Sequence, residues 1–465
     1  MAGMFVIGES KTRPGVYYNI DKAEKSSIVG AVDGIVGVLF RSDFGPLGKL
    51  VELNREDGYE ETFGTALTTD ALKEAFEGGA KTILAYRLGS EGTCSEVTLK
   101  NDAEEDLVKI IVKYPGERQF SVSIKQKLSD ENVKQCIIYS GLTQIEKFEF
   151  SAGEAEASAL AEEIKKSKAF IAELVKDGTL AEVAQTEMAG GTNPTVTNQN
   201  YSDGLAAIET TYFNTICVDT EEDAVHLLVQ AFLERVGEAG QMGLAVIAQK
   251  SSVDLEDKIE KGATYNDASL VYVVNAHVMA DGAEMDGYQT AARIAGMIAA
   301  VPANESLTHT EMEGYTELLE PMTPTQMVKA EKKGGLVLSY NTDKKVWIDN
   351  AINTLVTPAD NQDEGWKKIR RVKTRYELIY RMTRQAEQLV GKVDNDQNGR
   401  ATLISQMNAI GTAMIDEGKL TSCNVTENSK YAADTDYGYF DVDVVDKDSL
   451  EHVYLLFRFR YSTEA

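Results

Sequence analysis

The sequence predicts an α/β (mixed α+β) multidomain fold, with an α/β core, an inserted β-rich domain and extended strand arms at both ends. Three observations predict it. Apolar strand-like runs alternate with helical patterns at residues 26–87 and again at 213–300, several short strands interrupt this alternation at 94–190, and a strand pattern lies near each end. The length of 465 residues suggests about three domains.

The first part of the chain predicts an arm followed by the opening of the core. Glycine and proline punctuate residues 1–15, and the aromatic run at 16–20 predicts a short strand. An apolar run at 28–40, a Gly45-Pro46 turn, a helix near 70–77 and a buried strand at 82–87 then predict the first half of an α/β unit.

The pattern changes at residue 94. Strands are predicted at 97–99, 109–113, 121–125 and 135–139, and the Ala-, Glu- and Lys-rich segment 154–176 predicts a helix. The Gly- and Pro-containing segment 189–195 is a linker pattern, after which the α/β pattern resumes. Residues 94–190 are therefore predicted to be a domain inserted into the α/β core.

The second half of the core and the C-terminal region follow. Strands are predicted at 213–218, 244–249 and 270–278, and helices at 221–236 and 288–300. Residues 335–340 and 345–348 predict a hairpin, and long helices are predicted at 364–389 and 400–416. Apolar and basic residues alternate at 453–461, which predicts a strand with one apolar and one polar face.

The charge excludes some classes of partner. The chain carries 47 basic and 74 acidic side chains, a net charge of −27. Nucleic acids and anionic membranes attract basic surfaces, so neither is expected to be a direct partner. The N-terminus lacks a signal-peptide pattern, the apolar stretch 290–303 is interrupted by Arg293, and four distant cysteines form no CxxC pair.

No catalytic, cofactor or metal site is predicted. The phosphate-loop-like Gly3-x4-Gly8 segment has Glu9 where a lysine is needed. Residues 394–399 match the first half of a calcium loop, but Ser405 replaces its bidentate glutamate, so a polar turn competes with that interpretation. The four histidines share no metal-ligand spacing.

A basic cluster within an acidic chain is the first candidate interface. Residues 367–384 contain one acid, Glu377, and eight bases, for a segment charge of 8 − 1 = +7: Lys367, Lys368, Arg370, Arg371, Lys373, Arg375, Arg381 and Arg384. Such a run is either a solvated helix face or a surface that docks onto something acidic, since neighbouring like charges repel one another. The opposite sign of the rest of the chain favours docking.

The two terminal strands are the second candidate interface, because a strand needs a sheet to satisfy its backbone groups. Each can pair within its own chain or be donated to a neighbouring subunit. The candidate strand-exchange residues are Val16, Tyr17, Tyr18, Ile20, Val453, Leu455, Phe457, Phe459 and Tyr461.

Several segments together resemble the tail sheath proteins of contractile phage tails and R-type bacteriocin particles. They are Arg13-Pro14-Gly15-Val16-Tyr17, Phe44-Gly45-Pro46-Leu47-Gly48, residues 82–89, Tyr114-Pro115-Gly116-Glu117-Arg118, residues 189–195, the helix at 366–384 and the Asn398-Gly399-Arg400 turn. The resemblance covers nearly the whole chain and depends on the order of these segments.

The resemblance implies a structural subunit without an active site or cofactor. It implies helical polymerisation around an inner tube, and contraction that drives the tube into a target cell envelope. The implied partners are other copies of the chain through both arms, the inner tail tube protein gripped by the basic helix, and the baseplate and tail terminator at the ends. The subunit would be made in the host cytoplasm and reside in a virion tail or a released phage-tail-like particle.

In these terms residues 1–22 are the N-terminal arm, 23–93 and 193–350 the two parts of the α/β core, 94–192 an outward-facing insert, 351–448 a tube-facing domain and 449–465 the C-terminal arm. Two other classes remain open from the residues alone. A cytoplasmic α/β enzyme would form a small oligomer and show a ligand-dependent melting shift, and a surface-layer or adhesion protein would need an export signal.

Overall fold

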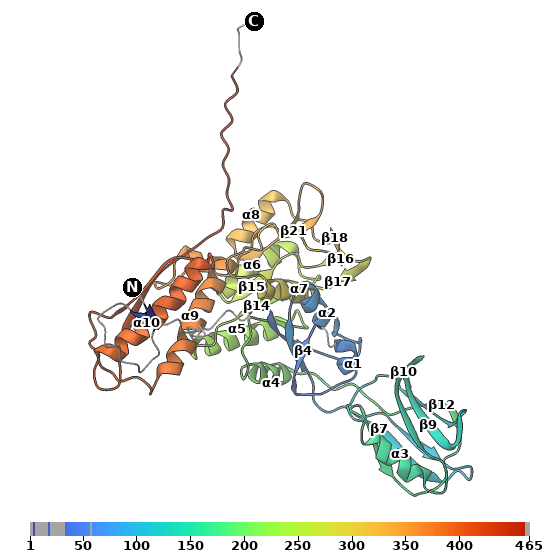
Figure 1. Ribbon diagram of the computed structural model, residues 1–465. Coiled ribbons are helices and arrows are strands. Elements are labelled where there is room, and N and C mark those ends of the chain that lie inside the picture. Colours follow the sequence, from blue (N-terminus) through green and yellow to red (C-terminus); the bar gives the residue numbers. More distant parts are fainter. Residues whose placement is uncertain (1–2, 5–16, 19–32, 56–57, 461–465) are drawn as a thin grey trace.

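A seven-stranded sheet forms the centre of the molecule (Figure 1). The computed structural model describes residues 3–4, 17–18, 33–55 and 58–460. The strand order is β19-β15-β14-β13-β3-β5-β4, and every neighbouring pair is parallel except β4 with β5. The strands are β3 (Ile35–Phe40), β4 (Leu50–Asn54), β5 (Thr82–Arg87), β13 (Thr215–Val218), β14 (Leu244–Ala248), β15 (Leu270–Val273) and β19 (Gly335–Leu336).

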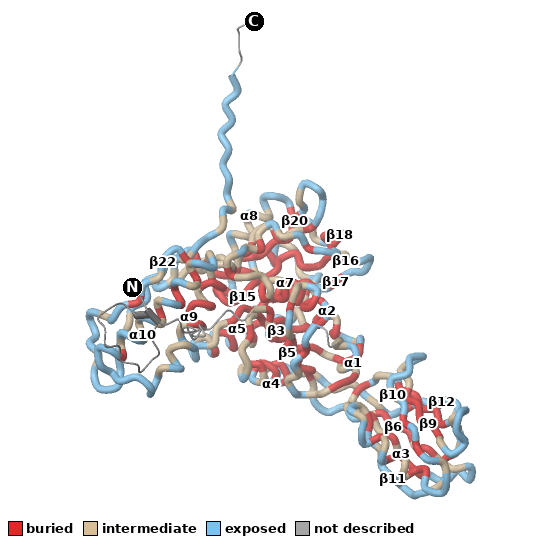
Figure 2. Tube along the Cα trace, viewed as in Figure 1, coloured by how far each residue is buried: buried red, intermediate tan, exposed pale blue. Residues whose placement is uncertain are grey.

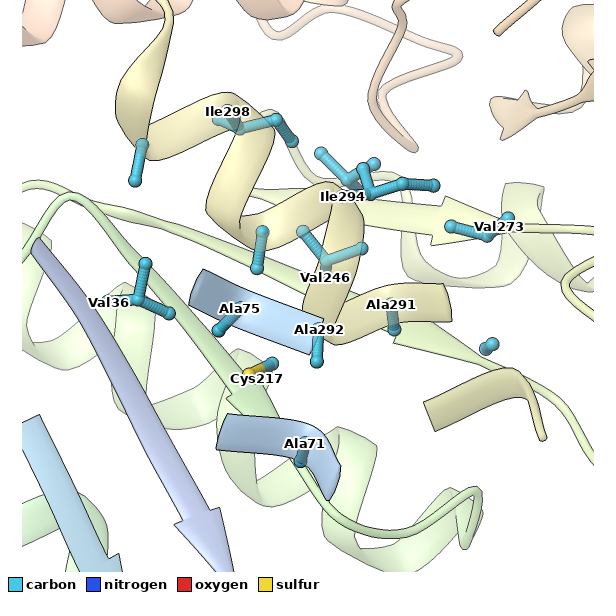
Figure 3. Close-up of a cluster of buried hydrophobic side chains, with 14 of the residues drawn as sticks. Val36, Ala71, Ala75, Cys217, Val246, Val273, Ala291, Ala292, Ile294 and Ile298 are labelled. Atoms are coloured by element: carbon cyan, nitrogen blue, oxygen red, sulfur yellow. The ribbon is translucent and has the colours of Figure 1, made fainter. Parts of the chain in front are cut away.

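Helices cover both faces of this sheet, as expected for buried parallel strands. Alternate strand residues supply the two faces: Val36, Val38 and Phe40 of β3 belong to one core cluster, and Leu39 to the other. Figure 3 shows α2 (Asp70–Glu77) and α7 (Gly287–Ala300) packing small side chains against the first face. The second face is covered by α4 (Asn198–Ile208), α5 (Asp223–Glu238), α6 (Leu255–Tyr265) and α8 (Pro324–Lys332).

The sheet has a topological switch point between β3 and β13, where ligands of open α/β sheets bind. Arg41 and Asp219 directly follow these two strands. Arg41 Nε donates to Asp219 Oδ2 at 2.8 Å, and the Tyr201 hydroxyl donates to Oδ1 at 2.7 Å. The chain's own side chains therefore occupy this position.

The insert is built from two sheets and a helix that project from the core (Figure 1). The four-stranded sheet has the order β10-β9-β8-β12 and the three-stranded sheet the order β11-β7-β6. Its elements are β6 (Glu96–Lys100), β7 (Asp106–Val112), β8 (Ser121–Lys127), β9 (Asp130–Ser140), β10 (Thr143–Ser151), α3 (Glu156–Ile164), β11 (Phe170–Leu174) and β12 (Val183–Glu187). These elements share one apolar cluster of their own.

The insert is joined tightly to the core. Residues 90–96 and 189–195 run side by side through three isolated bridges. Phe44, in the loop after β3, is buried in the insert's cluster, with its ring 5.4 Å from that of Phe120. The guanidinium of Arg87 is buried and donates to the carbonyls of Ser42, Gly45 and Pro115.

The helix predicted at 154–176 is wrong in its second half. α3 ends at Ile164, and residues 170–174 form β11, which pairs with β7. The Ser167 hydroxyl accepts from the backbone N–H groups of Ala169 and Phe170, and these bonds stabilise the turn between α3 and β11. The prediction was too long because it used helix propensity alone. In the structure, the pairing of β11 with the distant strand β7 overrides that propensity.

A C-terminal module completes the described chain. It contains the 3₁₀ turn η1 (Glu364–Lys367), α9 (Ile369–Leu389), α10 (Gln397–Asp416) and the antiparallel pair β22 (Leu420–Glu427) and β23 (Phe440–Asp446). The strand predicted at 270–278 is divided, because β15 ends at Val273 and β16 begins at Val278. The remaining elements are β1 (Gly3–Met4), β2 (Tyr17–Tyr18), α1 (Tyr59–Phe63), β16 (Val278–Ala280), β17 (Ala283–Met285), β18 (Tyr315–Leu318), β20 (Leu338–Tyr340) and β21 (Val346–Ile348).

Two negative findings apply to the part of the chain that the structure describes. None of its helices is long and apolar enough to cross a membrane, and no three His, Cys, Asp or Glu side chains gather as metal ligands. In the calcium-loop-like turn, Asp396 accepts from the Gly399 N–H and begins α10. Most of the phosphate-loop-like segment lies outside the described residues.

A buried histidine lies between two carboxylates near the end of β15. His277 Nδ1 is 3.3 Å from Glu320 Oε2, and its Nε2 is 3.2 Å from Glu221 Oε1. Lys258, fully buried, contacts Glu320 at 2.5 Å. Burial by itself lowers the pKa of His277, but hydrogen bonding with both carboxylates outweighs it and raises the pKa to about 9.

We therefore predict that His277 makes stability pH-dependent. Its pKa in the folded protein lies above the unfolded value of about 6.5, so its contribution is fully present below pH ~6.5 and is lost as the pH rises through 9. The free energy of unfolding should fall by about 2 kcal/mol over this range, allowing for solvent screening. Urea unfolding at several pH values should show this slope in the wild type and in the exposed control His452→Gln. An unchanged slope in His277→Gln would contradict the assignment.

Candidate functional site

The helix α9 joins the α/β core to the C-terminal module. Ile369 and Val372 in its first turns belong to the core cluster of the central sheet. Leu378, two turns later, belongs to the cluster of α10, β22 and β23. The apolar stripe of this helix is therefore buried along most of its length. Six of the eight basic side chains lie on this helix, and Lys367 and Lys368 directly precede it.

Three of the basic side chains pair with acids between residues 446 and 451. Arg371 and Arg375 both bond the carboxylate of Asp446, at the end of β23. Lys368 Nζ lies 2.8 Å from Asp448 Oδ2 and 2.8 Å from Glu451 Oε2. For these three side chains, the acidic partner expected from the sequence is therefore the chain's own segment 446–451.

Two others are buried inside the module. Lys373 Nζ donates to the carbonyls of Ile298 and Val301 at the C-terminus of α7, where a cation is favourable, and burial lowers its pKa to about 8. Arg381 is 2% exposed. Its guanidinium bonds Glu417 at 2.8 Å through both terminal nitrogens and contacts Glu377, which Lys419 also reaches at 2.6 Å.

The last three basic side chains, Lys367, Arg370 and Arg384, are held by fewer contacts within the chain. Lys367 pairs with the exposed Glu364 at 2.6 Å, and Arg370 donates to the Ser449 hydroxyl at 2.8 Å. Arg384 is exposed, lies over the ring of Tyr380, and forms no ion pair with any residue that the structure describes. Contact between the basic helix and a tube stays a prediction. Lys367 and Arg384 are the side chains whose charge is most available for it.

The pair β22–β23 offers a free strand edge. β22 packs on α10, whereas β23 has no second neighbour among the described strands, and its Val442, Val444 and Val445 are exposed. Beside it, a groove of about 810 Å³ lies against α9. Its apolar lining consists mainly of Leu378, Ile379, Met382, Leu420, Val442 and Val444. An unpaired edge beside an apolar groove is a template for an added strand.

The C-terminal segment leaves the body altogether. Residues 452–460 extend into solvent (Figures 1 and 2) and form no hydrogen bond with any other described part of the chain. Leu455, Phe457 and Phe459 are 72%, 71% and 94% exposed. The strand predicted at 453–461 is not formed in described residues 452–460, and its pairing within the chain, one of the two alternatives from the sequence, is absent among the described residues. Tyr461 lies outside them.

At the other end, Tyr17 and Tyr18 form β2, which pairs in parallel with β1. Val16 and Ile20 lie outside the described residues. Two features of the site were not predicted from the sequence: strand β23, and its ion pairs with α9. The alternation Asp441-Val442-Asp443-Val444 was the available signal for the strand.

Comparisons with known proteins give one family. Residues 195–354 match the family model described as phage tail sheath protein central domain. The chain is 23% identical over 465 residues to the phage-like element PBSX protein XkdK of Bacillus subtilis (strain 168), covering 95% of this chain and 96% of that protein. Among solved structures, a sheath tail protein from Desulfitobacterium hafniense is similar with a TM-score of 0.74 and 22% identity, covering 93% of this chain and all of that one. The anti-feeding prophage helical sheath in its contracted state gives 0.56 and 11%, covering 97% and 99%.

The buried charges of α9 generate a stability prediction. Arg381→Met should lower the free energy of unfolding by about 3 kcal/mol, because it removes a buried partner of Glu377 and Glu417. Adding Glu377→Gln should regain part of this loss by removing a buried charge. Chemical denaturation is the measurement, with the exposed Arg384→Met as matched control. Equal stability of the Arg381 and Arg384 variants would contradict the role of the network.

Proposed function

We propose that this chain is a structural subunit of a contractile tail sheath. Its copies polymerise helically around an inner tube and drive that tube through a target cell envelope. The observation that supports the proposal most is the free C-terminal segment 452–460, with exposed apolar side chains and an unpaired backbone. A monomer gains nothing from such a segment, whereas a polymer can use it as a donated strand.

The proposed contact is addition of the arm to the free edge of β23 in another copy. As a strand, the arm places Val453, Leu455, Phe457 and Phe459 on one face and Arg458 and Arg460 on the other. Burying the four apolar side chains would contribute about 6–12 kcal/mol. Ordering the segment would cost about 1–2 kcal/mol for each residue, so the hydrogen bonds of the added ladder are needed as well. Val16, Tyr17, Tyr18 and Ile20 are the proposed second donor, from the N-terminal arm.

The net charge of −27 makes such arms necessary for assembly. Acidic bodies repel one another at close range, so the attraction that holds a lattice together has to be short-ranged and specific. Two strand contacts per subunit reinforce each other, because forming the first holds the second near its target. Arms at both ends would thus link identical copies into a network.

The remaining partners follow from the same model. The C-terminal module, residues 351–448, would face the tube, and the basic helix would contact it, with Lys367 and Arg384 contributing most directly. The insert, residues 94–192, would face outward. Baseplate and tail terminator would bind the two ends of the polymer, which would be made in the host cytoplasm and end in a virion tail or a released particle.

Truncation tests the strand donation. Removing residues 453–465 should leave a folded subunit with a nearly unchanged melting temperature and should abolish sheath formation. Residues 453–460 are exposed and form no hydrogen bond with any other described part of the chain. A finer pair separates the faces of the strand: Phe457→Ser with Phe459→Ser should abolish assembly, and Arg458→Ser with Arg460→Ser should largely spare it. Negative-stain microscopy is the measurement. Normal striated sheaths from the truncated chain would rule out donation.

Charge reversal tests the tube contact separately. Lys367→Glu with Arg384→Glu should weaken co-sedimentation with purified tube protein about tenfold or more, while sheath–sheath assembly continues. The matched control makes the same charge change on the insert, with Lys165→Glu and Lys168→Glu. If both double variants bind the tube like the wild type, the basic helix is not the tube-binding surface.

A further inference from the structure

The segment between β23 and the free arm is held down by charges. We call residues 446–451 the arm root. Asp446, Asp448, Ser449 and Glu451 in this segment all bond basic side chains from the first two turns of α9 or the residue before it. After Glu451 such contacts stop within the described residues, and the chain is exposed. The point at which the arm becomes free is therefore defined by ionic contacts.

Asp446 is the centre of the arm root. Its Oδ1 accepts from Arg371 Nη2 at 2.6 Å, and its Oδ2 accepts from Arg371 Nε and Arg375 Nε, both at 3.0 Å. The Asp446 side chain is only 8% exposed. Burial by itself raises the pKa of Asp446, but the two guanidinium groups outweigh it and hold the pKa below its usual range. A bidentate, partly buried pair of this kind resists moderate salt.

Both arginines are held in position before they reach Asp446. The guanidinium of Arg375 lies 4.7 Å from the ring centre of Trp366 and 2.9 Å from Asp363 Oδ1. The guanidinium of Arg371 lies against Gly365: a Cβ there would be 2.2 Å from Arg371 Cζ. The turn η1 thus supplies a flat surface and a missing side chain that aim the two arginines at the arm root.

The far end of the arm root is tied to the α/β core. Lys368 bridges Asp448 and Glu451, each at 2.8 Å. Glu451 Oε1 also accepts from the hydroxyls of Ser306 and Thr308, at 3.2 and 3.3 Å. These two residues lie in the loop after α7. The arm root therefore spans from α9 to a core loop, and the orientation of both determines where the free arm begins.

We propose that Lys368, Arg371 and Arg375 are arm-positioning residues, which fix the direction and starting point of the C-terminal arm so that it reaches a second copy of this chain in register. The inference rests on the proposed strand donation. Releasing the six residues of the arm root would lengthen the free segment by about 20 Å. The donated strand would then sample more space and could slip by one residue, which turns its apolar face away from the sheet.

The proposal changes the role of part of the basic cluster. Arg371 and Arg375 are 20% and 16% exposed and already share a carboxylate, so they have little charge left for an external acid. Reversing their charge would disturb assembly through the arm, without any tube being present. Their effect on the sheath should therefore appear in sheath–sheath assembly and not only in tube binding.

Three variants test the proposal on the full chain. Asp446→Arg breaks the contact by repulsion. Gly365→Ala keeps every charge but displaces the Arg371 guanidinium. Asp446→Arg combined with Arg371→Glu, Arg375→Glu and Asp363→Asn restores the contact with its signs exchanged, and Asp363→Asn removes the charge that would repel the two new glutamates. The matched control is Asp436→Arg, the same charge change at an exposed acid that forms no ion pair among the described residues.

Two readouts keep the inference separate from the proposed function. In the unassembled subunit, hydrogen exchange of the Lys447 amide, which donates to the Lys419 carbonyl, should rise about tenfold or more in Asp446→Arg and Gly365→Ala. The polymerised fraction should fall by a similar factor, the sign-exchanged variant should recover in both, and Asp436→Arg should match the wild type.

Suppose that the wild type forms sheaths and that the variants with faster exchange in the arm root polymerise equally well. This result would overturn the inference but would leave strand donation intact. Unchanged exchange in both Asp446→Arg and Gly365→Ala would also overturn it. Failure of the wild type to polymerise would instead overturn the proposed function.

Discussion

The charged groups of α9 that become buried between the two units must each find a partner, and the rest of the C-terminal half depends on this constraint. Desolvation penalises an unpaired buried charge far more than a pair. Lys373 therefore bonds the last carbonyls of α7, Arg381 bonds Glu417 and Glu377, and Arg371 bonds Asp446. These contacts attach the helix to the core, the module and the arm root in turn. The same helix thus positions the free edge of β23 and the free C-terminal strand.

Much of the fold was predictable, because strongly patterned segments are determined locally. The predicted α/β multidomain class is confirmed by the similarity to a solved sheath tail protein, and the resemblance to tail sheath proteins is confirmed for residues 195–354 by the family match. The domain boundaries and the roles of individual site residues stay predictions. The helix predicted at 154–176 is wrong beyond Ile164, because pairing of β11 with β7, almost 60 residues away in the sequence, outweighs local propensity. Strand β23 was missed because its acidic residues, such as Asp441 and Asp443, dominate the composition of that segment.

The candidate site was predictable in part, for a related reason. The basic run at 367–384 and the acidic run before the C-terminus were both evident in the sequence. Their mutual neutralisation was not, because about 75 residues separate Arg371 from Asp446 and only the packing of α10 and β22 brings them together. The apolar alternation at 453–461 was easy to identify because it is local, but its strand conformation stays a prediction, since described residues 452–460 form no strand. The net charge of −27 therefore does not show that the basic residues of α9 attract the acidic segment 446–451 within the subunit.

We propose above all that residues 452–460 enter a sheet only when copies of the chain assemble. Hydrogen exchange of their backbone amides, measured by mass spectrometry before and after polymerisation, tests it most directly. In the unassembled subunit these amides should exchange at the rate of an unstructured peptide. In the polymer, the amides that form ladder hydrogen bonds should exchange at least about a thousandfold more slowly, because those bonds would break only when the contact between subunits opens. Equal, fast exchange of these amides in both states, in a sample that microscopy shows to be polymerised, would contradict the claim.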